Sequence, residues 1–259
     1  MSRENLIKEI HNKYSTNKIA ERINIAALIS ERAKQFSNEL VVVGGSAVEF
    51  YTAASYMTSD LDFIARDDFK IAEIMNSLGF NIDNQYIWSH PDTNVIIEFP
   101  KAPLAGDINR VQEIETEYGK AKIIGIEDII LDRIKGRVFW QDDNEWPEYM
   151  LYTHYDSIDF DYLLTESKKE LVDKAVEKMI EDVKAYKSGK ISSLRDLTYS
   201  DSEVEAKILS KLENDAEIDD IIFELCIDKL VKGKDLFSRR QYLKEIVKKS
   251  SEIQAWLKD

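Results

Sequence analysis

The stretch from Val41 to Phe63, VVVGGSAVEFYTAASYMTSDLDF, holds the only Gly-Gly pair of the chain and, after it, two aspartates one residue apart. The β-branched run before the glycines predicts a short buried strand. The segment SAVEFYTAASY predicts a helix, with Ser46 at its start as a favoured N-cap residue. The alternation in SDLDFIAR predicts a second strand. The stretch therefore predicts a strand, a glycine turn, a helix and a strand in succession.

Asp60 and Asp62 are expected on one face of the second strand, because successive side chains of a strand point to opposite faces. Leu61 and Phe63 then point into the core. Two neighbouring carboxylates repel each other unless a cation or a proton lies between them, and oxygen ligands suit Mg²⁺. A later strand, NVIIEFP, carries Glu98 and can complete a three-carboxylate cluster if it pairs beside the first. Such a cluster can hold metal ions that activate an attacking oxygen and stabilise a leaving pyrophosphate.

The glycine pair predicts a phosphate site. Gly44 and Gly45, between a strand and a helix, let the backbone approach a ligand closely and aim free N–H groups at it. Ser46 adds a hydroxyl group. Many strand-to-helix turns contain glycine, and an Asp-x-Asp pair often marks a solvated strand end, so each motif alone is weak. Their order, together with a third acidic residue on a later strand, favours a ligand site.

Outside this stretch, the first part of the chain mixes helices and strands. Helical spacing covers residues 3–16 and 17–37, and the amphipathic segment DFKIAEIMNSLGF ends near Gly79, a common helix stop. Strand candidates are NQYIWS, TNVIIEFPK and AKIIGI, and IEDIILDRIKGRVFW has helical spacing. Such a mixture predicts a small mixed β-sheet flanked by helices.

The last hundred residues are almost entirely helical in pattern, apart from a polar break from Lys187 to Glu203. The predicted fold class is therefore α/β, of the α+β type, with a helical C-terminal region. We expect one domain in residues 1–158, with N-terminal helices and the sheet, and a helical domain in residues 159–259.

Composition predicts a soluble, cytoplasmic protein. Of 259 residues, 44% are hydrophobic, enough for a sizeable core, and no apolar run reaches the roughly 20 residues of a membrane span. The single cysteine, Cys226, excludes a disulfide within the chain and a multi-cysteine zinc site.

The net charge of −14 disfavours general nucleic-acid binding. From Lys229 to Ser250, however, eight residues are basic and two acidic; a solvated helix face is the favoured interpretation, and a patch for a polyanionic partner is the alternative.

Aromatic residues gather between Arg137 and Asp156, in RVFWQDDNEWPEYMLYTHYD. Packing between the sheet and the helical region is the favoured interpretation, and a wall for a nucleobase or an acceptor is the alternative. His11, His90 and His154 have no metal-ligand spacing, so we expect them to be structural or exposed.

The quoted stretch resembles the signature of the DNA polymerase β-like nucleotidyltransferase superfamily: an apolar residue, Gly, Gly or Ser, a gap, and Asp-apolar-Asp-apolar. It is most similar to the small bacterial abortive-infection-type toxin nucleotidyltransferases, in which a Thr or Ser also shortly precedes the aspartates, as in MTSDLDF. The resemblance covers roughly residues 40–140. It implies that Gly44, Gly45 and Ser46 hold a nucleoside triphosphate.

The same resemblance implies that Asp60 and Asp62 bind the catalytic metals, Mg²⁺ or Mn²⁺, with Glu98 as the third carboxylate. The helix GIEDIILDRIKG resembles a family helix that begins Ser-Pro-Glu-Asp and carries a lysine. Gly125 and Ile126 replace Ser-Pro here, and Arg133 replaces the lysine as a nucleotide-binding residue.

The function that the resemblance implies is transfer of a nucleoside monophosphate from an NTP to an acceptor, with release of pyrophosphate. RNA, such as a tRNA end, or protein is the favoured acceptor; a toxin or phage-defence role and an antitoxin partner are expected from the same similarity. Two alternatives stay open: a small-molecule, antibiotic-type nucleotidyltransferase and a non-catalytic nucleotide-binding module of the same fold.

Overall fold

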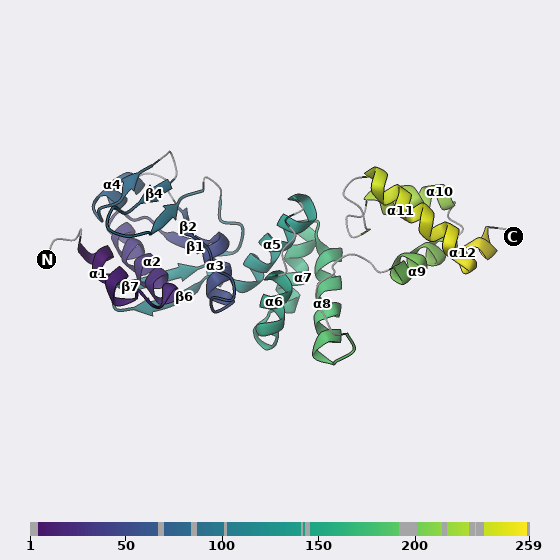
Figure 1. Cartoon of the computed structure of the whole chain (residues 1–259), viewed down its shortest axis with the longest axis horizontal. Coiled ribbons are helices and arrows are strands. Elements are labelled where there is room, and N and C mark those ends of the chain that lie inside the picture. The colour runs from purple at the N-terminus through teal and green to yellow at the C-terminus, as the bar shows by residue number, and fades with distance from the viewer. Residues whose placement is uncertain are drawn as a thin grey trace.

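The computed structural model describes residues 5–66, 70–83, 87–100, 103–140, 142, 146–191, 201–213, 217–227, 231 and 236–257. This part of the chain is a mixed α/β protein, as the sequence predicts. A seven-stranded sheet with flanking helices comes first, and helices alone follow it (Figure 1). The sheet, a first group of helices and a second group of helices succeed one another along the longest axis of the molecule (Figure 1).

The strands form one mixed sheet in the order β3-β4-β5-β2-β1-β7-β6. Strand β1 is antiparallel to β2 and parallel to β7, and β2 is parallel to β5. The strands are β1 Leu40–Val43, β2 Asp60–Ala65, β3 Asn81–Ile82, β4 Ile87–Ser89, β5 Ile96–Glu98, β6 Gln112–Thr116 and β7 Gly119–Ile123. Strand β2 therefore lies at the centre of the sheet, between β1 and β5.

Strands β3 and β6 are not predicted by the sequence pattern, because both lie at the edges of the sheet. The side chains of Gln112, Glu113 and Glu115 in β6 are exposed. Polar and charged residues are common on edge strands, where they discourage pairing with other chains. An edge strand of this kind lacks the apolar alternation by which the other strands are predicted.

Four helices pack on or beside the sheet. Helix α2 lies across β1, β6 and β7 and also contacts α1 and α4. Ile23 and Ala26 of α2 line a cavity of about 20 Å³ together with Val42 and Leu61, so α2 covers the face of the sheet to which Leu61 points. The helices are α1 Asn5–Lys13, α2 Lys18–Lys34, α3 Gly44–Tyr51 and α4 Ile71–Asn76.

Helices α5 to α8 pack against one another and form the first helical group. Helices α5 and α6 also contact α3, which joins this group to the sheet. The helices are α5 Ile126–Trp140, α6 Trp146–Thr153, α7 Phe160–Lys169 and α8 Asp173–Lys187, with 3₁₀ helices at Ile108–Arg110 and Tyr155–Ser157.

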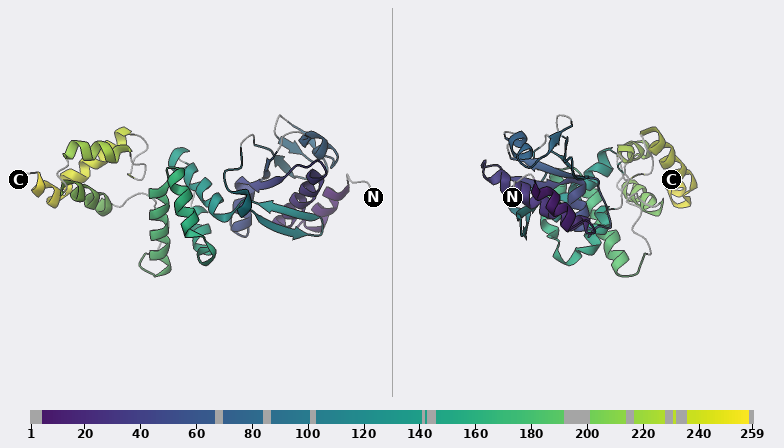
Figure 2. Two further views of the ribbon diagram at one scale, coloured as in Figure 1. Left: turned by 180° about the vertical axis from the view of Figure 1, so that it is seen from behind. Right: turned by 60° about the vertical axis from the view of Figure 1, so that its left-hand side comes forward.

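Helices α9 to α12 contact one another and form the second helical group, seen from behind in Figure 2. Cys226 on α10 is buried. The helices are α9 Asp201–Leu212, α10 Ile218–Ile227, α11 Leu236–Lys249 and α12 Ser251–Trp256.

The expected division of the chain at residue 158 stays a prediction; α5 and α6, before this residue, contact α7 and α8, after it. The polar break expected from Lys187 to Glu203 starts at the end of α8, and its residues 192–200 lie outside the described part. Among the described helices, none combines the length and the apolar character that a membrane crossing requires.

Candidate metal centre

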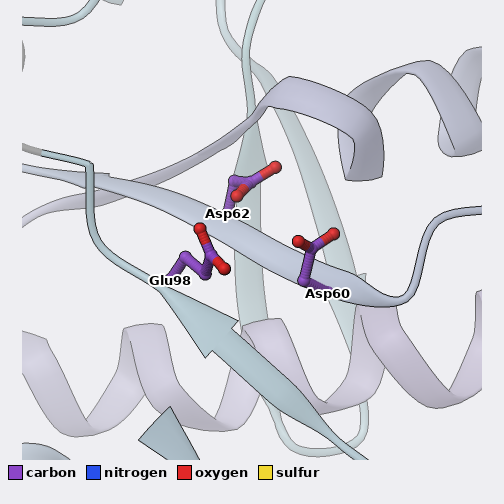
Figure 3. Close-up of side chains that lie close together, drawn as sticks. All are labelled: Asp60, Asp62 and Glu98. Atoms are coloured by element: carbon purple, nitrogen blue, oxygen red, sulfur yellow. The ribbon is translucent and has the colours of Figure 1, made fainter. Parts of the chain in front are cut away.

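Asp60, Asp62 and Glu98 come together on one face of the sheet, as the sequence predicts (Figure 3). One carboxylate oxygen from each lies within 4.8 Å of the corresponding oxygens of the other two. All three side chains are half-buried. Asp62 and Glu98 are register partners on the parallel strands β2 and β5, and Asp60 lies two residues before Asp62. The geometry is therefore a compact set of hard oxygen donors that a divalent cation can bridge.

The residues between the carboxylates anchor the two strands. Leu61, Phe63 and Ile97 are buried, on the opposite face from the acidic side chains. Phe63 also stacks on Phe99, with ring centroids 5.7 Å apart. Because strand side chains alternate, a slip of one residue would place the carboxylates in the core and expose these apolar groups. The core thus fixes the register that gathers the acidic residues.

The glycine turn makes room for Asp62. Gly44 has a φ of +61°, and a Cβ at this position would lie 2.2 Å from Asp62 Oδ2. The backbone N–H of Gly45 donates a hydrogen bond to the same oxygen at 3.2 Å. A Cβ on Gly45 would lie 3.0 Å from Thr58 Oγ1 and 3.1 Å from the Tyr56 hydroxyl. The glycine pair therefore places the carboxylate of Asp62 against the first turn of α3.

Ser46 does not begin the helix, contrary to the sequence expectation. Helix α3 starts at Gly44, with Val43 at the N-cap position and no side-chain cap. Ser46 lies within the helix and is buried, and its hydroxyl donates a hydrogen bond of 2.7 Å to the main-chain oxygen of Asp60. In this structure Ser46 thus ties α3 to the start of β2, and its predicted contact with a nucleotide stays a prediction.

Burial and neighbouring negative charges both disfavour the ionised form of Asp62. Burial, together with the negative charges of Asp60 and Glu98, raises the pKa of the Asp62 carboxyl from its ordinary value of 3.8 to about 6. The Gly45 N–H and the positive charge of Arg133 act in the opposite direction. A bound cation would relieve this repulsion, so the donor set and its charge both fit a divalent metal.

Arg133 of α5 is placed near enough for its charge to act on Asp62. Its guanidinium group lies 3.2 Å from Asp132 Oδ2, measured from Nη2. Its Nε–H is buried and has no hydrogen-bond partner among the described residues. A half-buried arginine whose positive charge acts on the acidic cluster is suited to balance the charge of phosphate groups.

Three residues around the cluster are not predicted as site residues. Thr58 precedes β2, and its hydroxyl donates a short hydrogen bond to Asp60 Oδ1. Arg22 of α2 donates to the main-chain oxygen of Thr58 and to the buried carboxylate of Glu49 on α3. The motif MTSDLDF includes Thr58 and signals it weakly, but no local pattern connects Arg22 with a site that forms far along the chain.

The acidic pair at the start of α5 is occupied by structural contacts. Asp128 Oδ1 accepts a hydrogen bond of 2.7 Å from the Tyr162 hydroxyl, and its Oδ2 accepts one of 3.1 Å from the Asp107 N–H. Glu127 accepts from the Asp159 N–H and pairs with Arg110 at 3.4 Å. Both carboxylates thus tie α5 to the start of α7 and to the loop before β6.

Aromatic contacts join the loop after α3 to α6. The Tyr56 and Trp146 rings lie edge to face with centroids 5.2 Å apart, and Trp146 and Tyr149 lie 5.9 Å apart. The Tyr149 hydroxyl is 2.9 Å from Ser55 Oγ. These contacts are those expected of packing between the sheet and the helical region. His154 plays a related part, since its Nε2 lies 2.8 Å from the Tyr51 main-chain oxygen.

Comparisons with known proteins give little similarity. No protein-family model matches the chain, and a search of curated proteins finds no match. Among solved structures, the antibiotic-resistance factor ANT(2″)-Ia is similar at 14% identity and a TM-score of 0.37, over 62% of this chain and 94% of that one. JHP933 from Helicobacter pylori is similar at 16% identity and a TM-score of 0.34, over 90% of this chain and 94% of that one. At such low identities and TM-scores, neither likeness supports an inference about this chain.

Proposed function

We propose that the protein is a metal-dependent nucleotidyltransferase, which moves a nucleoside monophosphate from an NTP to an acceptor. The observation that carries the proposal is the convergence of Asp60, Asp62 and Glu98, with ligand oxygens within 4.8 Å of one another, beside the Gly44–Gly45 turn that opens α3. A divalent cation site next to a glycine turn and a helix N-terminus is a combination suited to polyphosphate.

Asp60, Asp62 and Glu98 would hold Mg²⁺ or Mn²⁺. When bound there, the metal supplies charge neutralisation on the phosphates and a lowered pKa for the acceptor hydroxyl. Burial and the nearby negative charges, which together raise the pKa of Asp62, are an energetic cost of the metal-free site, and this cost favours binding of a cation.

The residues of the chain supply orientation, charge and a proton acceptor. The acceptor oxygen forms a bond to the α-phosphorus of the NTP while the bond from that phosphorus to pyrophosphate breaks, and pyrophosphate leaves with the electron pair. Glu98 accepts the proton of the acceptor hydroxyl. The positive charge of Arg133, which acts on Asp62, balances the charge of the phosphates. Most of the rate enhancement then comes from positioning and electrostatic stabilisation.

The local basic face of helix α11 supports RNA as the acceptor, although the net charge of −14 opposes it. Helix α11 exposes Phe237, Arg240, Lys244 and Lys248, which follow one another at helical spacings and share one face. A basic face with an exposed aromatic ring suits a nucleic-acid strand, because the cations bind phosphate and the ring stacks on a base. Lys229, Lys232 and Lys234 of the predicted basic segment lie outside the described residues.

A toxin or phage-defence role, with an antitoxin partner, belongs to the same proposal. It predicts growth arrest when the protein is expressed without that partner, and relief of the arrest by loss of Asp60 or Glu98. The other acceptors considered are a protein and a small molecule, and a non-catalytic nucleotide-binding module is the remaining alternative.

Incubation with each of four α-phosphate-labelled NTPs, Mg²⁺ and host lysate separates these possibilities. We expect label in RNA, lost in Asp60→Asn and Glu98→Gln and kept in Glu115→Gln, which removes an exposed carboxylate of β6. Label in protein or in a small molecule would replace the RNA acceptor. No label with any NTP, in a protein that still binds metal and nucleotide, would favour the non-catalytic module.

A further inference from the structure

We propose that Thr58, held in place by Arg22, is a positioning residue that orients Asp60 as a metal ligand. This inference rests on the proposed metal centre and adds to it two residues that do not touch the cation themselves. Groups that hydrogen-bond to metal ligands fix the orientation of those ligands and strengthen metal binding.

Thr58 contacts Asp60, the proposed metal ligand, through a hydrogen bond between the two side chains. The Thr58 hydroxyl donates to Asp60 Oδ1, and its oxygen would lie 3.0 Å from a Cβ on Gly45. Thr58 therefore lies between the glycine turn and the first aspartate. Its hydrogen bond holds one carboxylate oxygen and so limits the rotation that mutual repulsion of the acidic groups would otherwise favour.

Arg22 fixes the backbone from which this hydroxyl projects. Its Nη2 donates to the main-chain oxygen of Thr58, and its Nη1 donates to Glu49 Oε2. Glu49 is buried, with 2% of its surface exposed, so the guanidinium group has a fixed anchor on α3. The planar fork of an arginine can hold two acceptors at once, which the single ammonium group of a lysine holds less well.

The arrangement connects three segments with the cation site. Arg22 comes from α2, Glu49 from α3 and Thr58 from the segment before β2. An ion pair that served only to pack α2 on α3 would need neither the Thr58 main-chain contact nor the hydroxyl contact to Asp60. Burial lowers the pKa of Arg22, and the negative charges of Glu21 and, next, of Asp60 oppose this fall.

Binding of Mn²⁺ to the purified full chain, measured by electron paramagnetic resonance of the free ion, tests this role without any turnover. We expect Thr58→Val to weaken binding about 10- to 100-fold, which is the usual effect of losing a hydrogen bond to a metal ligand. Thr58→Ser, which keeps the hydroxyl, should restore binding to near the wild-type level. Arg22→Lys should weaken binding to a lesser extent, and it keeps a positive charge beside Glu49, so the buried carboxylate is not left unpaired.

Thr116→Val is the matched control, because the Thr116 hydroxyl donates to the Gly119 oxygen in the β6–β7 turn, away from the acidic cluster. It should bind Mn²⁺ like the wild type. Binding by Thr58→Val that equals the wild type would overturn the positioning role and leave the metal centre standing. Equal weakening by Thr58→Ser, or by Thr116→Val, would also overturn it. A wild-type chain that binds no Mn²⁺ would reject the metal centre and this inference together.

Discussion

Asp62 and Glu98 are register partners on neighbouring parallel strands, although 36 positions separate them in the sequence. Strands β2 and β5 lie side by side at the centre of the sheet, so both carboxylates emerge from the same face (Figure 3). Asp60 lies on the same face, because it precedes Asp62 by two residues and strand side chains return to one face every second residue. A cluster of this kind is unfavourable without a cation, because its negative charges repel one another. The glycine turn and the hydrogen bonds around the cluster nevertheless hold the carboxylates together.

Gly44→Ala should disrupt the site more than an ordinary glycine substitution. The new Cβ would lie 2.2 Å from Asp62 Oδ2, and the φ of +61° adds backbone strain. We expect a loss of about 2–4 kcal/mol in unfolding free energy and a loss of Mn²⁺ binding. Thermal unfolding and a Mn²⁺ titration measure both effects.

Gly189→Ala provides the control for backbone strain alone. Gly189 has a φ of +71°, but a Cβ there meets nothing within 4 Å. It should cost about 1 kcal/mol and leave Mn²⁺ binding unchanged. If both variants bind Mn²⁺ as the wild type does, the glycine turn does not determine the position of Asp62.

Asp62→Asn should stabilise the metal-free protein at neutral pH. The pKa of Asp62 is about 6 in the folded state, against 3.8 for the ordinary group. The folded state therefore binds more protons between these values, and stability falls as the pH rises through this interval. The asparagine variant lacks this loss, and we expect a gain on the order of 1 kcal/mol above pH 7, shrinking to nothing near pH 4.

Chemical denaturation at a series of pH values, with and without Mg²⁺, measures this effect. Saturating Mg²⁺ should stabilise the wild type and reverse the order of the two proteins, because only the folded wild type binds the ion tightly. A variant that is less stable than the wild type at pH 7.5 without metal would show that Asp62 carries no electrostatic cost.

Arg133→Gln should weaken NTP binding and leave Mn²⁺ binding nearly intact. Arg133 is not among the proposed metal ligands, and its positive charge, which acts on Asp62, is assigned to the phosphates. We expect a rise of about tenfold in the Kd of a non-hydrolysable NTP, corresponding to the loss of one charge-assisted contact. Lys135→Gln is the control on the same helix, because Lys135 pairs with Glu170 at 3.1 Å. Equal effects of the two variants, measured by calorimetry, would remove Arg133 from the nucleotide site.

Charge reversal on α11 should weaken RNA binding. We expect the triple variant Arg240→Glu, Lys244→Glu and Lys248→Glu to bind RNA at least tenfold more weakly at low salt and with a shallower salt dependence. NTP and Mn²⁺ binding should not change. Fluorescence anisotropy with labelled RNA at several salt concentrations measures the effect.

The control for this variant reverses the same number of charges elsewhere. Lys168, Lys174 and Lys184 are exposed on α7 and α8. Their reversal should weaken RNA binding much less than reversal on α11. Similar losses from both triple variants would indicate a response to net charge and not to the α11 face.

The central strands and the shared face of Asp60 and Asp62 could be predicted because their causes are local. Alternation in SDLDFIAR places Asp60 and Asp62 opposite Leu61, and the apolar run around Glu98 indicates a second buried strand. The pairing of β2 with β5 could only be assumed, since strand order depends on the packing of the whole sheet. Edge strand β6 lacks a clear pattern, because its charged residues face solvent.

The supporting residues are harder to predict. Arg22 lies in a helix whose pattern indicates only an amphipathic surface, and its partners Glu49 and Thr58 come together only when α2 and α3 pack on the sheet. Ser46 shows the opposite case, in which a favoured N-cap residue lies within the helix because the glycines before it already adopt the first turn. Tertiary contacts, and not local preference, decide both outcomes.

Anomalous diffraction from crystals that contain Mn²⁺ and a non-hydrolysable NTP would locate the metal ion and the nucleotide together. We expect an anomalous peak among the carboxylates of Asp60, Asp62 and Glu98, with the phosphates of the nucleotide next to it at the Gly44–Gly45 turn. A fully occupied nucleotide with its phosphates elsewhere, and no Mn²⁺ peak at the three carboxylates, would contradict this expectation.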